Sequence, residues 1–363
     1  MLALCARSGL VKVGVVAVEG TKIAAAATHH ARHVCIDNTY GLTYKVGMAA
    51  RSREDTNRVE SSESRMTYTE FLRLFPDNTA CLDYLRDKFY PAGSPCPKCK
   101  RESRFHRIKG RSAYSCQFCG HHVYPTAGTI FHKSTVSLHL WFYAIFLMSS
   151  TRCGMAAKQL EREIGVTYKT AHRMFKLIRS MLAEEEDGTP DFGGGGVPVE
   201  ADETYIGARR RGKPGRPAEG DPVKTPVFAM VERNGRVRAM IVPNAQRVTL
   251  LPIIKRNVKP DTTVYTDEMR AYDLLAREGF KHRRIAHSLD MFVVGDIHTN
   301  TVEGYFGLIK GGLNGVYRGA VRRHLMQSYL DEYSFRYNHR HTINRDPMFW
   351  NFLRRIQADR LPA

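Results

Sequence analysis

Four cysteines in two close pairs constrain this chain more than any other feature of its sequence. The motif CPKCK holds Cys96 and Cys99, the motif CQFCG holds Cys116 and Cys119, and sixteen residues separate the pairs. Paired C-x2-C motifs at such a spacing are typical of a structural zinc ion bound by four thiolates. Disulfides are the alternative, but a chain in a reducing cytoplasm keeps its thiols reduced. The sequence therefore predicts a zinc ribbon over residues 91–133.

Residues within and beside the cysteine pairs suit such a ribbon. Pro97 favours the turn of the first pair, and Gly120 can adopt the left-handed conformation that ends the second. The intervening segment FHRIKGRSAYS predicts a hairpin that turns at Lys109 and Gly110. The remaining cysteines show no ligand spacing, and we expect them to fill apolar space: Cys5, Cys35, Cys81 and Cys153.

Beyond the ribbon the hydrophobic pattern becomes helical. The apolar run from Leu138 to Met148 has eleven residues, too few to cross a bilayer, which takes about 20, and it predicts a buried helix. In GMAAKQLEREIGVTYKTAHRMFKLIRSML, Gly165 separates two helical patterns and Thr167 can cap the second. This arrangement over residues 134–183 is typical of a helix-turn-helix, whose second helix can enter the major groove; a helical hairpin with a solvated face is the alternative. The residues expected to face DNA are Tyr168, Lys169, Thr170, His172 and Arg173.

Three acidic residues mark the C-terminal half of the chain. Asp202 in VEADETYIG and Asp267 in VYTDEMRAY each end an apolar, β-branched run, which predicts carboxylates at strand ends. Glu303 in HTNTVEGYFGLIK opens a helical pattern, and Lys310, seven residues later, shares its helix face. Carboxylates are the ligands that two divalent ions need for phosphoryl transfer. Each acid taken alone is more often a solvated or capping carboxylate.

In these strings the chain resembles the insertion-sequence transposases of the ISXO-like group, which are DDE transposases, over residues 66–345. The resemblance implies a multidomain α+β protein with a zinc ribbon, a helix-turn-helix region and a ribonuclease H-like α/β catalytic domain with a mixed sheet. It also implies that Asp202, Asp267 and Glu303 hold two Mg²⁺, or Mn²⁺ in their place. We rank Glu303 above Asn300 as the third member, and we regard Lys310 as a phosphate contact.

The order of elements agrees with such a catalytic domain. Residues 66–90 predict N-terminal helices, and the acidic, glycine-rich residues 184–196 predict a flexible linker. Strands are expected at 197–206 and 263–266, near 284–286, and in a hairpin over 225–244 that turns at Asn234 and Gly235. Helices are expected at 250–258 and 272–279. The catalytic domain would then span residues 197–345, followed by a C-terminal tail over 346–363.

Charge predicts a nucleic-acid partner. The formal net charge of +19 and the pI near 9.7 favour contact with polyanions. The loop GARRRGKPGRPAEGDP can contact DNA phosphates, or can simply be solubilising; its cations are Arg209, Arg210, Arg211, Lys213 and Arg216. A second basic and aromatic cluster, suited to DNA or to capping a last helix, contains Arg336, Tyr337, Asn338 and Arg340.

The first 65 residues lie outside this plan. The segment SGLVKVGVVAVEGTK resembles a fragment of an unrelated class of DDE transposase, with Glu19 where that class has its first catalytic aspartate. We interpret residues 1–65 as a poorly ordered extension, either a fused remnant or the result of a start codon assigned too far upstream. The polar stretch AARSREDTNRVESSESR has the composition of a disordered segment. Met66 is then a natural beginning, with Thr69 and Glu70 opening a helix.

We therefore expect a transposase that binds the inverted ends of its element and then cleaves and joins DNA in the presence of Mg²⁺. Its partners would be transposon ends and target DNA, and two ends must be paired, which favours a homodimer or a larger assembly. The stretch from Val13 to Val18 has no signal-peptide cleavage pattern, so we expect a cytoplasmic protein. The alternatives are a catalytically decayed zinc-ribbon and helix-turn-helix regulator, and a nuclease that hydrolyses DNA without joining it.

Overall fold

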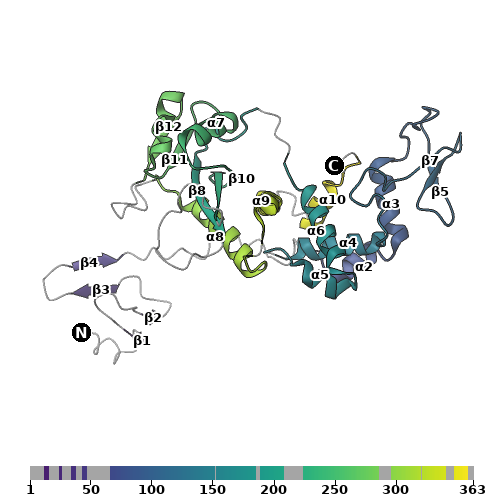
Figure 1. The fold of residues 1–363 in the computed structure, drawn as a ribbon, viewed down its shortest axis with the longest axis horizontal. Coiled ribbons are helices and arrows are strands. Elements are labelled where there is room, and N and C mark those ends of the chain that lie inside the picture. Colours follow the sequence, from purple (N-terminus) through teal and green to yellow (C-terminus); the bar gives the residue numbers. More distant parts are fainter. Residues whose placement is uncertain are drawn as a thin grey trace. The chain divides into compact units, whose positions relative to one another are not determined.

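The computed structural model describes residues 66–151, 153–184, 189–207, 224–285, 296–319, 321–340 and 347–358, and four short strands before residue 66. Contacts divide the chain into two units, residues 1–61 and residues 62–363 (Figure 1). In the first unit β1 (Lys12–Val15) pairs with β2 (Ala24–Ala26), and β3 (Val34–Asp37) pairs with β4 (Thr43–Val46), both antiparallel. The interpretation of residues 1–65 as a remnant stays a prediction.

A helical core forms from both ends of the second unit. Its helices are α2 (Tyr68–Leu74), α3 (Asn78–Phe89), α4 (Leu138–Ser150), α5 (Ala157–Ile164), α6 (Tyr168–Ser180) and α10 (Met348–Arg354). Helix α4 buries six of its side chains and contacts α3, α6 and α10, as its apolar run predicts. Helix α2 begins at Tyr68, one residue before the expected Thr69, and its N-cap is Thr67. The hydroxyl of Thr67 accepts a hydrogen bond from the Glu70 N–H at 3.2 Å, and the Glu70 carboxylate accepts one from the Thr67 N–H at 2.7 Å.

Helix α10 replaces the expected C-terminal tail. Phe349, Phe352 and Leu353 are buried in the same core as α4, and the ring of Phe349 meets that of Phe71 edge-on with centroids 5.9 Å apart. Lys88 of α3 donates hydrogen bonds to two carbonyl oxygens at the end of α10, where the helix dipole favours a cation. Helix α10 packs into the core because its three large apolar side chains would otherwise be exposed to water.

The ribbon is a three-stranded antiparallel sheet in the order β5-β6-β7. Its strands are β5 (Phe105–Arg107), β6 (Tyr114–Cys116) and β7 (His122–Val123). The hairpin between β5 and β6 passes through Gly110 at a φ of 75°, which confirms the predicted turn. Strand β7 adds a third member that the sequence pattern did not predict.

A mixed five-stranded sheet in the order β10-β9-β8-β11-β12 forms the C-terminal part of this unit. Its strands are β8 (Val199–Gly207), β9 (Lys224–Glu232), β10 (Val237–Ile241), β11 (Thr263–Thr266) and β12 (Lys281–Arg284). Strand β9 runs antiparallel to both β8 and β10, whereas β11 runs parallel to β8 and β12. The hairpin turns at Asn234 as predicted. The predicted helix at 272–279 is instead two short 3-10 turns, Arg270–Tyr272 and Leu275–Glu278. The zinc-ribbon, helical and mixed-sheet regions agree with the multidomain α+β fold class.

Helices cover both faces of this sheet (Figure 1). Alternate side chains of β9 divide between two cores: Val227, Ala229 and Val231 pack with α8 (Asn300–Gly315) and α9 (Arg323–Asn338), and Phe228 and Met230 pack with α7 (Arg247–Asn257). This division follows from the two-residue period of a strand. The sheet therefore forms the middle layer between α7 and the α8–α9 pair.

The basic and aromatic cluster at the end of α9 is largely structural. Arg336 is buried, and its guanidinium donates hydrogen bonds to the carbonyl oxygens of Met148 at 2.6 Å and Thr151 at 2.7 Å. The side-chain oxygen of Asn338 accepts a hydrogen bond from the Val237 N–H at 2.7 Å, and its amide donates one to the Val237 carbonyl at 3.0 Å. Asn338 thus pairs with the outer edge of β10 as a neighbouring strand would.

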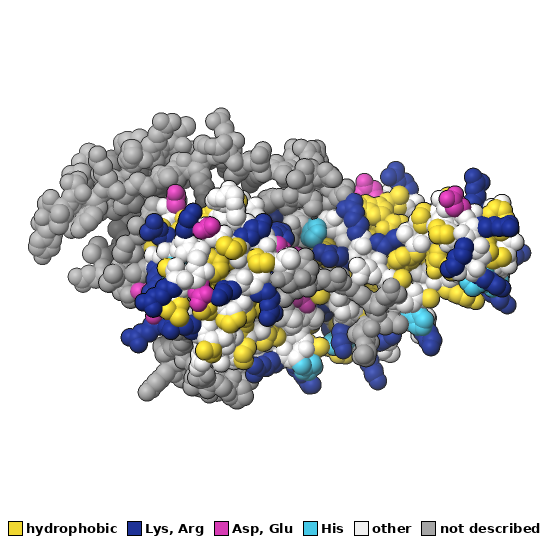
Figure 2. Space-filling model, turned by 90° about the horizontal axis from the view of Figure 1, so that it is seen from above, with side chains coloured by type: hydrophobic (Ala, Val, Ile, Leu, Met, Phe, Trp, Pro, Cys, Tyr) yellow, Lys and Arg dark blue, Asp and Glu magenta, His cyan; other side chains and the backbone are white. Residues whose placement is uncertain are grey.

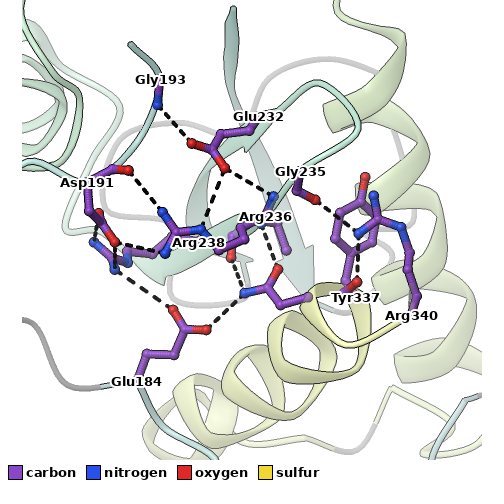
Figure 3. Close-up of polar contacts among 11 residues, drawn as sticks. Glu184, Asp191, Gly193, Glu232, Gly235, Arg236, Arg238, Tyr337 and Arg340 are labelled. Atoms are coloured by element: carbon purple, nitrogen blue, oxygen red, sulfur yellow. Dashed lines mark hydrogen bonds and ion pairs between the residues drawn. The ribbon is translucent and has the colours of Figure 1, made fainter. Parts of the chain in front are cut away.

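The glycine-rich segment before β8 is packed against the sheet, which differs from the expected free linker. Phe192 is fully buried in the core that includes α7. Figure 3 shows Asp191 beside Arg236, which directly precedes β10, and Arg238 of β10; its carboxylate lies 3.0 Å from Arg236 and 3.3 Å from Arg238. Glu184 lies 3.8 Å from Arg238. One buried aromatic ring and two carboxylates anchor the segment, and residues 185–188 lie outside the described residues.

Candidate active site and metal centres

The four cysteine sulfurs of the ribbon converge. All four Sγ atoms lie within 4.8 Å of one another, with 3.7 Å between Cys96 and Cys119 and 3.8 Å between Cys99 and Cys116. A tetrahedral zinc with bonds of about 2.3 Å places its sulfurs about 3.8 Å apart. A disulfide requires about 2.05 Å. The arrangement therefore fits a structural zinc ion and does not fit disulfide bonds.

Both cysteine pairs fold into the same tight turn. The N–H of Lys100 donates to the Cys96 carbonyl at 2.9 Å, and the N–H of Gly120 donates to the Cys116 carbonyl at 3.0 Å. Gly120 has a φ of 66°, as predicted, and Lys100 has a φ of 60° in the equivalent place. The hydroxyl oxygen of Ser103 lies 3.2 Å from the Cys116 sulfur. This hydrogen bond, together with backbone N–H groups of Cys119 and Phe118, outweighs burial and lowers the pKa of the Cys116 thiol to about 6. A lowered thiol pKa favours the thiolate that metal binding needs.

Helices α5 and α6 have the expected helix-turn-helix connection. Gly165 ends α5 at a φ of 71°, and the Thr167 hydroxyl caps α6 by accepting a hydrogen bond from the Thr170 N–H at 3.3 Å. Lys169 and Arg173 are exposed on α6, whereas Thr170 and His172 are half-buried. The two exposed cations are therefore the better placed of these residues for contact with a phosphate backbone.

Adjacent strands bring Asp202 and Asp267 together. Val264 and Tyr265 of β11 pair in parallel with Val199 and Glu200 of β8, and continuing this register sets Asp267 level with Asp202. Asp267 follows the last residue of β11, as predicted, but Asp202 lies inside β8 because that strand continues along β9 to Gly207. The acids meet where β8 and β11 cease to pair.

Asp202 lies in a strongly unfavourable environment for a carboxylate. Burial, followed by repulsion from Glu203, Asp267 and Glu303, raises the pKa of Asp202 to about 8. The N–H of Glu203 partly offsets these effects by donating a hydrogen bond to Asp202 at 2.8 Å. Concentrated negative charge of this kind would be relieved by a bound cation.

Glu203 is a member of the site that our sequence reasoning missed. Oxygen atoms of Asp202, Glu203 and Asp267 all lie within 4.8 Å of one another. The buried hydroxyl of Tyr272 donates a hydrogen bond to Glu203 at 2.8 Å and holds its carboxylate in place. The adjacent Asp-Glu pair was visible in the sequence, but alternation along a strand placed the two side chains on opposite faces.

Glu303 lies in the first turn of α8, near this group but outside it. Its carboxylate is exposed and accepts a hydrogen bond from the Thr299 hydroxyl at 2.7 Å. Repulsion from Glu303 contributes to the raised pKa of Asp202. The structure thus gathers two of the predicted acids and sets the third beside them.

The other two predicted site residues lie elsewhere on α8. Asn300 is the exposed first residue of the helix. Lys310 is exposed, with its ammonium 6.0 Å from the centre of the Phe306 ring. The basic loop lies outside the described residues, and with it the predicted DNA contacts Arg209, Arg210, Arg211, Lys213 and Arg216.

None of the helices in the described part of the chain combines the length and the apolar character needed to cross a bilayer. The apolar helix α4 has 13 residues. Its apolar surface is instead buried against other helices of the same unit.

Comparison with known proteins agrees with the division into a ribbon and a catalytic part. Residues 194–338 match the ISXO2-like transposase domain family, and residues 76–122 match the transposase zinc-ribbon domain family. The chain is 30% identical over 261 residues to an uncharacterized protein in transposable element ISH50 of Halobacterium salinarum, covering 67% of this chain and 85% of that protein. It is 39% identical over 103 residues to an uncharacterized transposase-like protein of Haemophilus influenzae, covering 28% of this chain and 81% of that protein.

Proposed function

The chain belongs to the ISXO2-like transposases, and on that premise we propose that it binds the terminal inverted repeats of an insertion sequence and catalyses Mg²⁺-dependent DNA cleavage and strand transfer. One observation carries this proposal: Asp202 and Asp267 meet where β8 and β11 cease to pair, and Glu303 is close enough to raise the pKa of Asp202. Three carboxylates from separate segments would form the catalytic group.

The donor set fits hard divalent cations. Carboxylate oxygens of Asp202, Glu203 and Asp267 lie within 4.8 Å of one another, and no cysteine or histidine belongs to that group among the described residues. Oxygen-only ligands favour Mg²⁺ and Mn²⁺ over zinc. When bound, a pair of such ions activates the attacking oxygen and stabilises the leaving oxygen of a phosphodiester.

The residues of the chain position the carboxylates for this chemistry. The N–H of Met269 holds the Asp267 carboxylate at 2.9 Å, and the Tyr272 hydroxyl holds Glu203 at 2.8 Å. Hydrolysis at the end of the element would release a 3′-hydroxyl, which would then attack a target phosphodiester and displace its 3′ oxygen. Both steps are direct displacements at phosphorus, so no covalent protein intermediate is required.

Recognition of the ends would come from the ribbon and from α6. A cavity of about 460 Å³ lies between α6 and the beginning of α9. Four of its lining side chains are basic residues of α6 and a fifth is a histidine of α9; the lining residues are Lys169, Thr170, His172, Arg173, Lys176, His324 and Leu325. On the face drawn in Figure 2, lysines and arginines are far more numerous than acids. A basic hollow beside a candidate recognition helix suits a DNA backbone.

The oligomeric state follows from the reaction. Strand transfer of an element joins two ends, so we propose that a homodimer or a larger assembly forms on DNA. The basic loop over residues 208–223 would contact phosphates near the site.

Cleavage and joining of a labelled duplex that carries the end of the element tests the proposed function. With Mg²⁺ the full chain should cleave and join, and with Ca²⁺ it should only bind. Glu303→Ala should lose both reactions and retain binding, whereas Asn300→Ala should retain most activity. Loss of activity in Asn300→Ala alone would exchange the roles of these two residues. If the full chain binds the duplex but neither cleaves nor joins it, the protein is a catalytically decayed transposase that only binds DNA.

A further inference from the structure

Glu200, two residues before Asp202 on β8, is a fully buried carboxylate. One of its oxygens accepts hydrogen bonds from the N–H groups of Thr301 at 2.8 Å and Val302 at 3.1 Å. The other accepts from the Thr301 hydroxyl and from Nε of Arg233, both at 2.8 Å. Nδ1 of His298 lies 3.3 Å from the same oxygen. These contacts occupy both oxygens of Glu200.

These contacts tie together two of the segments that carry catalytic acids. Glu200 precedes Asp202 by two residues on β8, so the two side chains lie on the same face of the sheet. Thr301 and Val302 immediately precede Glu303 at the beginning of α8. The free N–H groups of a helix N-terminus favour a carboxylate there. The distance between Asp202 and Glu303 therefore depends on how Glu200 holds this end of α8.

Arg233 extends the connection to the third segment. Besides its ion pair with Glu200, Arg233 donates a hydrogen bond to the carbonyl of His298 at 3.1 Å, just before α8. Its guanidinium lies over the ring of Tyr265, 4.3 Å from the centroid. Tyr265 pairs with Glu200 across the two strands and precedes Asp267 by two residues. Each of the three acids thus lies one or two residues from Glu200 itself or from a residue that contacts the Glu200–Arg233 pair.

Resting on the proposed function, we propose that Glu200 is a positioning residue that aligns Glu303 with Asp202 and Asp267 and thereby sets the affinity of the site for divalent cations. Glu200 is not itself a metal ligand, because its side chain has no exposed surface and hydrogen-bond donors of the protein occupy both of its carboxylate oxygens. The connection acts through the backbone of α8, so loosening it should weaken cation binding before it unfolds the domain.

Two substitutions of Thr301 test this role without removing a buried charge. Thr301→Val keeps the shape of the side chain and the backbone hydrogen bonds but removes the hydroxyl that donates a hydrogen bond to Glu200. Thr301→Ser retains that hydroxyl. We would measure Mn²⁺ binding to the full-length, zinc-loaded protein by calorimetry, with Asp202→Asn as the background for binding elsewhere. We expect Thr301→Val to bind Mn²⁺ about tenfold more weakly, the effect of one lost hydrogen bond to a charged group. Thr301→Ser should bind nearly as the wild type does.

Thermal unfolding in the absence of Mn²⁺ separates positioning from simple stabilisation. A lower unfolding temperature for Thr301→Val with unchanged Mn²⁺ affinity would overturn the positioning role, as would equal weakening in both Thr301 variants. Glu200→Gln should show a larger loss of Mn²⁺ affinity, and the Thr301 pair decides the question if that variant does not fold. A wild-type protein that binds no Mn²⁺ above the Asp202→Asn background would contradict the proposed metal site itself.

Discussion

Glu332 on α9 accepts a hydrogen bond from Nε of Arg179 on α6 at 2.7 Å, and this pair joins the helix-turn-helix to the helices that cover the sheet. Both side chains are buried, and Glu332 also accepts hydrogen bonds from Arg336 at 2.7 and 3.0 Å. Arg179 further donates to the Tyr317 hydroxyl at 3.1 Å. One carboxylate shared by two arginines therefore connects the candidate DNA-binding helix with the part of the chain that carries the acids.

Replacing Glu332 should be costly at neutral pH. Burial alone would raise the pKa of Glu332, but Arg179 and Arg336 outweigh it and hold that pKa below its ordinary value of 4.5. A carboxylate with a lowered folded-state pKa stabilises the fold above its unfolded-state pKa and loses that effect as pH falls. Glu332→Gln should lower the free energy of unfolding by about 3–5 kcal/mol at pH 7, because it leaves two arginines without their buried partner.

Denaturant unfolding from pH 7 down to pH 3 checks this prediction. The difference between wild type and Glu332→Gln should shrink as the pH falls below 4.5. Glu278→Gln is the matched control, since its ion pair with Lys255 is partly exposed and should contribute at most about 1 kcal/mol. Equal losses of unfolding free energy in the two variants would show that Glu332 and its two arginines stabilise the fold no more than a partly exposed ion pair does.

Asp202→Asn should stabilise the metal-free protein while abolishing DNA cleavage. The folded state raises the pKa of Asp202 from 3.8 to about 8, so this group favours folding below its unfolded-state pKa and progressively opposes it as the pH rises toward 8. The neutral amide removes that repulsion. In the presence of a chelator that spares the zinc, the variant should unfold at a temperature higher by about 2 °C or more at pH 8. A lower unfolding temperature would show that the carboxylates do not repel one another.

Cys96→Ser should remove zinc and end recognition together. Structural zinc supplies folding free energy, so a ribbon with three thiolates should lose its metal and unfold locally. Elemental analysis should give one zinc per chain for the wild type and for Cys153→Ser, a control outside the cluster, and far less for Cys96→Ser. Full zinc content in Cys96→Ser would rule out this ligand.

Two adjacent glycines of α8 should respond oppositely to alanine. A Cβ on Gly312 would lie 1.7 Å from the hydroxyl of the buried Tyr333, which donates a hydrogen bond to the Cys153 carbonyl, so Gly312→Ala should cost about 1–3 kcal/mol. A Cβ on Gly311 meets no described atom within 4 Å, and Gly311→Ala should gain up to about 1 kcal/mol from helix propensity. Unfolding by urea measures both. A stabilised Gly312→Ala would show that α8 and α9 can separate without penalty.

Removal of residues 1–65 should leave folding, zinc content and DNA cleavage intact. The contacts of residues 1–61 form a unit of their own, and the match to the zinc-ribbon family begins only at residue 76. Cleavage of the labelled duplex and thermal unfolding would be compared between the truncated and full chains. If the truncated protein aggregates or fails to cleave DNA, residues 1–65 are needed for folding or for activity.

Features that depend on local spacing could be predicted from the sequence. The zinc ribbon follows from four cysteines in two turns, the β9–β10 hairpin follows from Asn234 and Gly235, and the strand before Asp267 has the predicted bounds. The expected helix at 272–279 was wrong because a helical pattern of that length can also fold as 3-10 turns. The interpretation of residues 346–363 as a tail was incomplete, because the apolar side chains of α10 pack into the helical core that the N-terminal helices of the same unit also form.

The sequence by itself determined the ribbon, the helix-turn-helix connection, the mixed sheet and the transposase family, because each depends on residues that are close in the chain or on long matching strings. Only the tertiary structure decided that Glu203 joins Asp202 and Asp267, that Arg336 is buried, and that Glu200 holds the end of α8. Glu200 and Thr301 are 101 residues apart in the chain, and no periodicity connects them. Their contact exists because the sheet and α8 pack together and leave a buried carboxylate that needs hydrogen-bond donors.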